Sequence, residues 1–493
     1  MGIWQWIRRQ FSGGAHQAAE ERAASKERPT AQSAHVPVQV PRGQRPVPDL
    51  PPDLLQFSVT PAGATTDVVI GFDFGTSCAK VAIQTPYALG GRTVIVDFGR
   101  VGHDSCTYLL PAAVHRDSAD RWHLVRPKGQ SEHRRHLKLP LLGEIRNGQA
   151  PDNSSTAGAV AFVALALREA RRVFLQTQAD TYGRIRLRWS MNLGIPSAGY
   201  DDEGIRRRFL EVARAGWLAS FSSEVNSTAI EAAIAASKTY APSEAPIAVV
   251  PEVAAEMVGY ARSRYRRPGL HTVIDIGAST LDVCGIELLA QDGEDAYELL
   301  TADVTDLGFL ELHSRRMGVA GHRPPFDAVP NDLVAPFVGL RGLPDDLRRS
   351  LQRCDQEYVE DATAVVVRTL AWLHKCRAPG SPAWREGLPL FVTGGGADSQ
   401  IANQIIRRTD ERAKGMWVNY GGLVRQPLPM DVAVGPSDAA NAGTAPRMAV
   451  AYGLSFPEIN IGRIVPPNEI PDVEPEPMRR RDWQRAYIDK DAV

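Results

Sequence analysis

Two near-copies of one short pattern decide the fold of this chain: Gly71-Phe-Asp-Phe-Gly-Thr-Ser-Cys-Ala-Lys80 and Ile274-Asp-Ile-Gly-Ala-Ser-Thr-Leu-Asp-Val283. Each combines an apolar strand, an aspartate, a turn of glycine with threonine or serine, and a second strand. A third glycine-rich turn, Val392-Thr-Gly-Gly-Gly-Ala397, follows another apolar strand. Two acid-tipped hairpins that face each other are suited to clamp a metal-bound polyphosphate, so the pattern predicts a nucleotide site.

The three turns supply different parts of this site. Glycine lets the backbone approach an anion closely, and the N–H groups of such a turn bind the anion. Asp73 and Asp275 at the strand ends are predicted to hold Mg²⁺ through water, because carboxylates are tolerable near phosphates only beside a cation. The residues predicted to contact the nucleotide are small or hydroxyl residues of the turns: Gly75, Thr76, Ser77, Gly277, Ala278, Ser279, Gly394, Gly395 and Gly396. One such turn alone is usually structural, but three in this order favour a nucleotide site.

The composition is that of a globular protein with more than one core. With 493 residues, two or three lobes are expected. The formal net charge of −1 gives no reason to expect a nucleic-acid partner. Five scattered cysteines, an odd number, indicate reduced thiols and a cytoplasmic protein. No transmembrane segment and no signal peptide are expected, because no apolar run is long enough.

Both ends of the chain are predicted to lie outside the fold. Residues 1–64 form an N-terminal arm that we expect to be mostly disordered, because it is rich in Gly, Ala, Pro and charged residues. In its tip, residues 1–11, apolar residues recur at helical spacing beside two arginines. This tip favours a frayed or self-docked terminus over a weak peripheral membrane contact or a partner anchor. Residues 456–493 form a tail rich in Pro and charged residues.

A three-strand meander occurs twice. The meander strands are predicted over residues 67–73, 79–84 and 93–98, and again over 272–277, 281–288 and 297–304. Further strands are predicted over residues 187–195, 247–250 and 388–392, and helices over 155–176, 201–219, 251–263, 354–375, 398–408 and 446–454.

This duplication predicts an α/β fold of two lobes with a cleft between them. Lobe I is expected over residues 65–264, with an irregular, histidine-rich insertion at 99–150. Lobe II is expected over residues 265–445, with an insertion at 305–385. A helix at 446–455 is expected to return to lobe I.

Over residues 67–454 the chain resembles the ATPase superfamily of actin, the sugar kinases and the DnaK-type heat-shock chaperones. Asp73–Ser77 resembles the first phosphate loop, Asp275–Thr280 the second, and Gly394–Gly396 the adenosine turn. Three further segments resemble the two connecting helices and an element of the DnaK branch: Pro251–Tyr260, Arg447–Gly453 and Leu110–Val114. The resemblance implies two lobes, each with a five-stranded sheet and helices, that close on Mg-ATP.

The resemblance also implies catalytic roles, in addition to those of Asp73 and Asp275. Lys138 matches a lysine that positions the attacking water, and Thr280 matches a γ-phosphate contact. Glu252 matches a glutamate of the first connecting helix but stands one position away, because the chain has Pro-Glu in place of Glu-Pro. The second loop has Ala278-Ser279 where the chaperones have two glycines. Slow hydrolysis is therefore expected.

The leading hypothesis is a DnaK-like ATPase without the peptide-binding domain. It would bind ATP or ADP with Mg²⁺, and lobe closure would regulate a partner protein through the arm, the tail or a lobe surface. An actin-like filament former that self-assembles and a nucleotide-binding module without turnover remain alternatives. A sugar kinase is the least favoured, because no catalytic aspartate for a hydroxyl acceptor stands out.

Two other groups of residues favour structural roles. The five histidines of the insertion lack the Cys or acidic spacing of zinc sites, so a metal site there is disfavoured: His103, His115, His123, His133 and His136. Cys78 in the first turn is expected to be a buried, inert thiol.

Overall fold

The protein is described by a computed structural model over nine stretches of the chain. The described residues are 65–87, 92–102, 106–146, 153–182, 185–241, 245–291, 294–321, 343–432 and 445–473. The chain divides into two units, residues 1–45 and 46–493, and every described residue belongs to the second. The predicted N-terminal arm with its tip, residues 474–493 of the tail and His103 lie outside the described residues.

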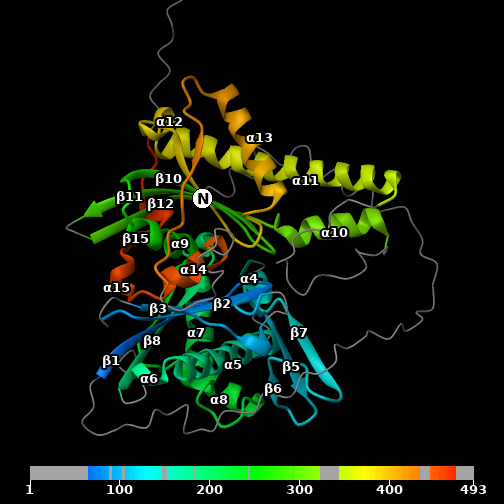
Figure 1. Cartoon of the computed structure of the whole chain (residues 1–493), viewed down its shortest axis with the longest axis vertical. Coiled ribbons are helices and arrows are strands. Elements are labelled where there is room, and N and C mark those ends of the chain that lie inside the picture. The colour runs from blue at the N-terminus through cyan, green and yellow to red at the C-terminus, as the bar shows by residue number, and fades with distance from the viewer. Residues whose placement is uncertain are drawn as a thin grey trace, which may run out of the picture. The chain divides into compact units, whose positions relative to one another are not determined.

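The first sheet is built around the strand that carries Asp73. Its strands are β1 (Thr65–Asp73), β2 (Cys78–Thr85), β3 (Arg92–Ile95), β4 (Leu110–Pro111), β8 (Arg186–Ile195) and β9 (Ile247–Pro251). They follow the order β3-β2-β1-β8-β9, with β4 paired to β2. The first three strands form an antiparallel meander, whereas β8 and β9 run parallel to β1. Figure 1 shows this sheet beside the helices α5, α7 and α8.

The second sheet repeats this plan around the strand that carries Asp275. Its strands are β10 (Gly269–Ile276), β11 (Leu281–Gln291), β12 (Glu294–Thr305), β13 (Leu388–Thr393), β14 (Leu423–Arg425) and β15 (Arg463–Val465). The order β14-β13-β10-β11-β12-β15 places five strands in the same sequence and directions as those of the first sheet. The predicted strands and the mixed α/β class are confirmed. The prediction of five strands per sheet is wrong, because the short strands β4 and β15 carry no periodic apolar signal.

The helices pack on these sheets through apolar faces. The longer helices are α5 (Asn153–Thr177), α7 (Glu203–Ala219), α8 (Ser227–Ser237), α9 (Glu252–Ala261), α10 (Phe309–Ala320), α11 (Asp345–Trp372), α13 (Gln400–Met416) and α14 (Ala445–Leu454). The shorter ones are α4 (Lys138–Arg146), α6 (Ala179–Tyr182), α12 (Ala383–Glu386) and α15 (Glu458–Ile461). α14 packs on α9 and on β1 and β2. A Cβ on Gly71 of β1 would lie 2.3 Å from the Ala451 carbonyl oxygen, so glycine is needed for this close approach.

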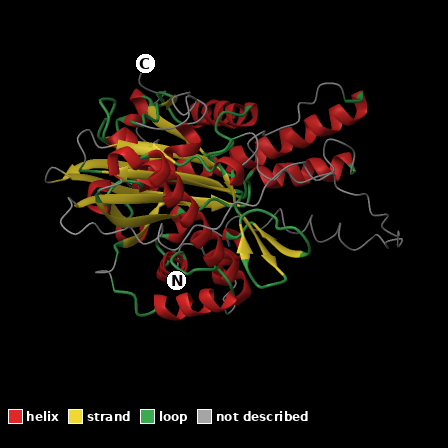
Figure 2. Ribbon diagram, turned by 60° about the horizontal axis from the view of Figure 1, so that its bottom comes forward, coloured by secondary structure: helices red, strands yellow, loops and turns green. Residues whose placement is uncertain are grey.

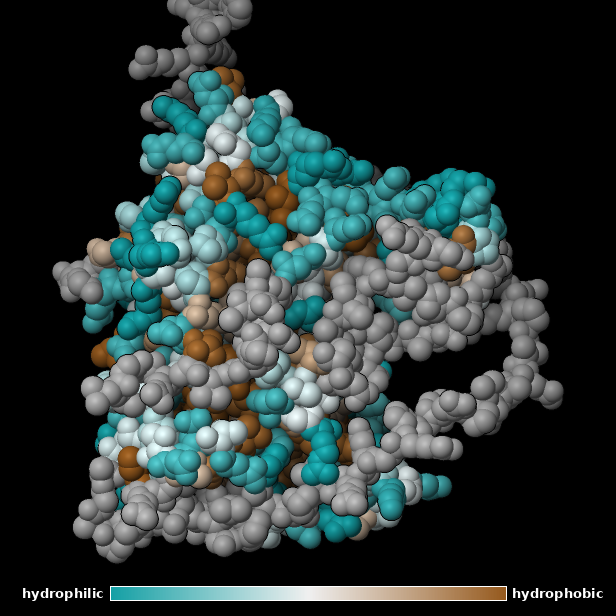
Figure 3. All heavy atoms as spheres, in the orientation of Figure 1, coloured by the Kyte–Doolittle hydropathy of each residue, from teal (hydrophilic) through white to brown (hydrophobic). Residues whose placement is uncertain are grey.

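Two large apolar cores belong to the two sheets. In the first, Phe162 of α5 lies against Phe72 and Phe74 of the first hairpin. In the second, the buried face of α11 packs with β10, β11 and β13. The outer surface over α11 is mainly hydrophilic (Figure 3), as expected for a helix with one buried face. No helix in the described stretches has both the length and the apolar character needed to cross a bilayer.

The insertion at 99–150 is not irregular, which corrects the prediction. It contains a three-stranded sheet in the order β6-β5-β7, visible as the separate group of strands in Figure 2. The strands are β5 (Ala113–Asp117), β6 (Trp122–His123) and β7 (Ser131–Arg135). They escaped prediction because they are short and charged, without an apolar face. Trp122 replaces that face: its ring lies 5.4 Å from the guanidinium carbons of both Arg116 and Arg134.

Several helices also differ from the sequence prediction, and neither α10 nor the short helices α4, α6, α12 and α15 were predicted. α8 was not predicted at all, although Asn226 caps it by accepting a hydrogen bond from the Ala229 N–H group. α11 begins at Asp345 rather than at residue 354, and α13 continues to Met416 rather than ending at 408. Both longer helices extend through charged turns, where the apolar periodicity is weakest.

Candidate functional site

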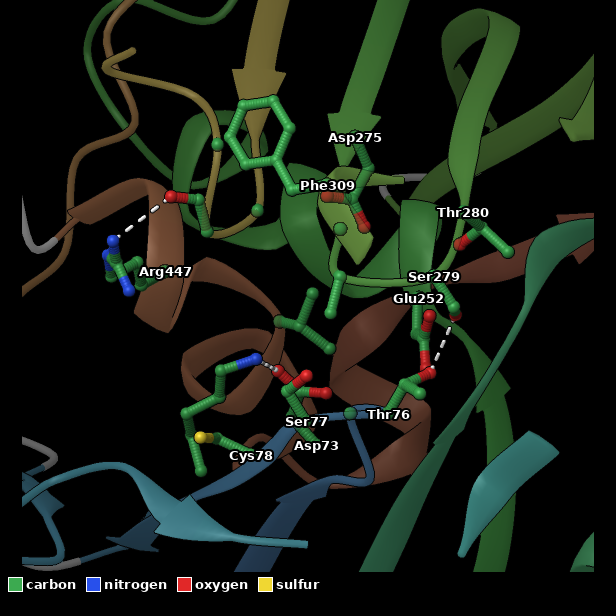
Figure 4. A pocket seen from close by; sticks show the side chains of 18 of the residues that line it. Asp73, Thr76, Ser77, Cys78, Glu252, Asp275, Ser279, Thr280, Phe309 and Arg447 are labelled. Atoms are coloured by element: carbon green, nitrogen blue, oxygen red, sulfur yellow. Dashed lines mark hydrogen bonds and ion pairs between the residues drawn. The ribbon is translucent and has the colours of Figure 1, made fainter. Parts of the chain in front are cut away.

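The two aspartate-tipped hairpins and the third glycine turn line one cavity of about 100 Å³. Every residue predicted for the site borders this cavity: Asp73, Gly75, Thr76, Ser77, Lys138, Glu252, Asp275, Gly277, Ala278, Ser279, Thr280, Gly394, Gly395 and Gly396. The sequence prediction did not include seven further lining residues: Cys78, Lys80, Leu109, Phe309, Pro446, Arg447 and Val450. Figure 4 shows side chains of both hairpins converging on this space.

The first hairpin carries its own countercharge. Asp73 and Lys80 are directly opposite in the β1–β2 ladder, and the Lys80 ammonium donates to Asp73 Oδ2 at 2.8 Å. Burial by itself would lower the pKa of Lys80, but the carboxylate of Asp73 outweighs this effect and raises it. Gly75 is required at the turn, since a Cβ there would lie 2.3 Å from the Cys78 carbonyl oxygen. The Ser77 carbonyl accepts a hydrogen bond from the Ala112 N–H group at 2.8 Å.

The second hairpin is hydrogen-bonded to the start of α10. Its turn closes through a hydrogen bond from the Gly277 N–H group to the Thr280 carbonyl at 2.9 Å. Three carbonyl groups of the turn accept N–H groups from the entrance of α10. These bonds are Phe309 to Gly277 at 3.1 Å, Leu310 to Ala278 at 2.7 Å and Gly308 to Ser279 at 3.2 Å. Carbonyl oxygens that would repel an anion are thereby engaged elsewhere.

A direct hydrogen bond joins the two turns. The hydroxyl oxygens of Thr76 and Ser279 lie 2.8 Å apart (Figure 4). Ser279 stands where the resemblance would place glycine, so this contact depends on a departure from the family pattern. The two hairpins are therefore in contact across the cavity.

The third turn closes the cavity from the side of α14. Gly394 has φ of 82°, and a Cβ there would lie 2.0 Å from Asp275 Oδ1. A Cβ on Gly396 would lie 2.5 Å from the Phe309 ring. Gly395 has no such steric requirement, and its carbonyl accepts a hydrogen bond from Arg447 Nη2 at 3.0 Å. Gly394 and Gly396 are thus needed for the close packing of this turn on the second hairpin.

Lys138 and Glu252, which are 114 positions apart in the chain, form a buried ion pair at the cavity. Lys138 Nζ donates to Glu252 Oε1 at 2.6 Å, and the two side chains are 7% and 11% exposed. Lys138 begins α4, and Glu252 begins α9 directly after Pro251. Burial and then Asp73 raise the pKa of Glu252, although Lys138 opposes the rise. The one-position shift of Glu252 in the sequence has not removed its side chain from the cavity.

A layer of carboxyl groups lies behind the cavity. Burial, then Glu252 and Asp73, raise the pKa of Asp275 to about 7. Burial and then Asp275 raise the pKa values of Glu256 and Asp282 well above the ordinary range. Within the described chain, Asp275 Oδ1, Asp282 Oδ1 and Glu256 Oε2 are buried without a hydrogen-bond partner. Negative charge is therefore disfavoured here unless a cation joins the group.

These carboxylates do not form a closed metal cage. Among the described residues, no three His, Cys, Asp or Glu side chains converge as metal ligands. This holds also for the insertion, where the rings of His115 and His133 stack with centroids 4.5 Å apart. Mg²⁺ at nucleotide sites usually takes one or two carboxylates together with waters and phosphates, so Asp73 and Asp275 fit that mode.

Simple spacing rules would have found one of the missed lining residues, Lys80, and two carboxyl residues behind the cavity, Asp282 and Glu256. Lys80 and Asp282 each follow the hairpin aspartate by seven positions and are its partner across the ladder. Glu256 lies four positions after Glu252 and so on the same face of α9. Arg447 carries no comparable signal.

No family model matches this chain, and no curated protein matches it in a sequence search.

Proposed function

We propose that this chain binds a magnesium-bound nucleoside triphosphate, ATP in the first instance, between the two hairpins and hydrolyses it slowly. The two sheets would then be the lobes of an actin-like fold, closest in kind to the ATPase part of DnaK-type chaperones. The observation that carries the proposal is the meeting of both hairpins, the glycine turn and the Lys138–Glu252 pair at one cavity. The common order of five strands in the two sheets supports the fold.

The residues present fit a magnesium ion. Asp275 lines the cavity, and its Oδ1 atom is buried without a hydrogen-bond partner in the described chain. Asp73 and Asp275 would hold Mg²⁺ through water molecules. When bound, Mg²⁺ supplies positive charge against the phosphate oxygens.

The chain's own residues would divide the remaining work. The turn glycines let backbone N–H groups approach the phosphates. The Thr280 hydroxyl donates a hydrogen bond to the terminal phosphate. Lys138 orients the attacking water, while Glu252 fixes the ammonium group at 2.6 Å. Lys80 adds a second positive charge at the first turn. Positioning and charge stabilisation of this kind provide most of the catalysis in phosphoryl transfer.

Nucleotide entry requires the hairpins to separate. The cavity of about 100 Å³ is smaller than the roughly 300–1,000 Å³ of typical ligand sites. Entry would break the Thr76–Ser279 hydrogen bond and move the two sheets apart. Such a movement can regulate a protein partner, which is the biological role we propose.

A nucleotide-binding module without turnover is the second candidate. The specific observation in its favour is that the Lys138 ammonium is engaged by Glu252 in a buried pair. If this pair held the ammonium group out of reach of the attacking water, the nucleotide would be bound but not hydrolysed.

ATP turnover by the purified full chain separates these functions. We expect slow hydrolysis, reduced about a hundredfold in Lys138→Ala and Thr280→Ala, with ATP binding lost in Asp73→Ala. Lys128→Ala, an exposed lysine of the same insertion, is the matched control and should behave as wild type. ATP binding without turnover would favour the second candidate. Absence of ATP binding by the wild type would refute both candidates. An increase in light scattering on addition of ATP would indicate that the chain forms filaments.

A further inference from the structure

Three histidines form a row across the small sheet of the insertion. His115 of β5 lies directly opposite His123 of β6 and His133 of β7 in the two ladders. Because directly opposite residues of paired strands point to the same side, the three imidazoles share one face of this sheet (Figure 2). The other face carries Trp122, which is buried in the first core. The histidine row therefore lies on the face that is turned away from that core.

Two of these histidines lie close to each other and to an arginine. The rings of His115 and His133 stack with centroids 4.5 Å apart. Burial, then His133 and Arg126, lower the pKa of His115 to about 4. Burial, then Arg135 and Arg126, lower the pKa of His133. Arg126 is exposed, and no carboxylate of the described chain pairs with it. Its charge therefore faces both rings without a counterion from the described residues.

The two carboxylates of the small sheet are engaged elsewhere. Asp117 lies on the same face as the histidines and accepts hydrogen bonds from Arg121 Nε at 3.1 Å and from His123 Nε2 at 3.0 Å. Burial alone would raise the pKa of Asp117, but hydrogen bonds from Arg121 and His123 lower it to about 2. Glu132 lies on the other face, where it pairs with Arg116. Neither carboxylate pairs with Arg126.

This arrangement suits an oxyanion better than a metal ion. Guanidinium and imidazole N–H groups donate charge-assisted hydrogen bonds to phosphate oxygens. The Nδ1 atom of His115 is buried without a hydrogen-bond partner in the described chain. A divalent cation bound to the two rings would be repelled by Arg126, whereas an anion would be attracted. The absence of three converging metal ligands among the described residues agrees with this reasoning.

We propose that this face of the insertion sheet binds a phosphate group or a similar oxyanion beside Arg126, His115 and His133. The guanidinium group and the two imidazoles would donate hydrogen bonds to the anion. The anion would in turn supply the negative charge that the described residues do not provide there. None of the three residues lines the nucleotide cavity, so the proposal does not depend on the function of that cavity.

The imidazole resonances of the full chain test this site. Titration with inorganic phosphate at constant ionic strength should shift the resonances of His115 and His133 saturably, because a bound anion favours protonated imidazole. Arg126→Gln should weaken binding about tenfold, because it removes a charge-assisted hydrogen bond. Arg207→Gln, at an exposed arginine of α7, is the matched control and should bind phosphate as the wild type does. The resonance of the buried His271 reports whether each variant stays folded.

The same resonances identify the source of the anion and the outcomes that contradict the proposal. Tighter binding of phosphoserine than of inorganic phosphate would indicate a phosphorylated protein as the ligand, and the reverse would indicate a free ion. Unchanged resonances of His115 and His133, or equal affinity in Arg126→Gln, would overturn the proposal. Broadening of these resonances by Zn²⁺ without any response to phosphate would also overturn it and would assign the histidine row to a metal.

Discussion

The two hairpins that frame the cavity are near-copies in sequence and topology but differ in charge. In the first, the residue across the ladder from Asp73 is Lys80, and the two side chains form an ion pair. In the second, the residue across from Asp275 is Asp282. Like charges directly opposite in a ladder are unfavourable, and Asp275 has no cationic partner at its Oδ1 atom in the described chain.

This single difference gives the hairpins different requirements. The first is close to neutral by itself and can be stable in the absence of any ligand. The second gathers negative charge that only protons or an added cation can neutralise. This difference in charge therefore predicts that binding of metal and nucleotide stabilises mainly the second hairpin.

The largest effect is expected from breaking the pair of the first hairpin. Lys80→Met should lower the free energy of unfolding by about 3 kcal/mol, because it leaves Asp73 buried without its partner. Urea denaturation measures this loss. Lys80→Arg keeps the charge and is the control, with a smaller expected loss. A Lys80→Met protein as stable as the wild type would show that the ion pair does not stabilise the first hairpin.

The next prediction concerns the pH dependence of the second hairpin. The pKa of Asp275 is raised from 3.8 to about 7, so the folded protein retains a proton that the unfolded chain has already released. Between about pH 4 and about pH 7, this group should therefore lower the stability as the pH rises, with no further change above that window. Midpoints of thermal unfolding, measured at several pH values in the presence of a metal chelator, give the slope of stability against pH.

Asp275→Asn is the control for the pH experiment, and its slope should be flatter. Mg²⁺ should also flatten the slope of the wild type, because a cation favours the ionised carboxylate. An identical slope in the wild type and Asp275→Asn would contradict the assignment to this residue.

A smaller effect is expected when the unfavourable pair of the second hairpin is removed. Asp282→Asn should raise the free energy of unfolding by about 1 kcal/mol at about pH 8, since burial and Asp275 disfavour the ionised carboxylate of Asp282 in the folded protein and asparagine carries no charge. At about pH 3, below the ordinary pKa of 3.8, the gain should vanish, because Asp282 is then protonated in both the folded and the unfolded chain. A gain of the same size at both pH values would exclude charge as its cause.

The smallest effect concerns the contact between the hairpins. Ser279→Ala removes one hydroxyl of the Thr76–Ser279 bond and should strengthen ATP binding about fivefold, since opening the cavity would cost one hydrogen bond less. Ser279→Thr keeps the hydroxyl and is the control. Titration calorimetry measures both affinities, and weaker binding by Ser279→Ala would mean that this hydroxyl contacts the nucleotide instead.

The local sequence pattern was sufficient to predict the two hairpins, but it was not sufficient to predict the residues and elements that pack around them. Asp73, Asp275 and the turn glycines could be predicted because each lies next to its own apolar strand and turn. The Lys138–Glu252 contact could not be derived from spacing, because it joins two helices 114 positions apart. The two residues entered the prediction separately, through a family resemblance, and their contact was not predicted. The sheet β5–β7 was missed because Trp122 and two arginines replace the usual apolar face.

The second turn is attached to the start of α10, so a movement of the turn would also move this helix. The carbonyl groups of the turn accept hydrogen bonds from the N–H groups of Gly308, Phe309 and Leu310. The helix α10 in turn packs along α11. α11 has 28 residues and is therefore about 42 Å long. A small displacement of the turn would be amplified into a larger swing at the Asp345 end of α11. A partner that touches that end could sense the cavity without approaching the nucleotide.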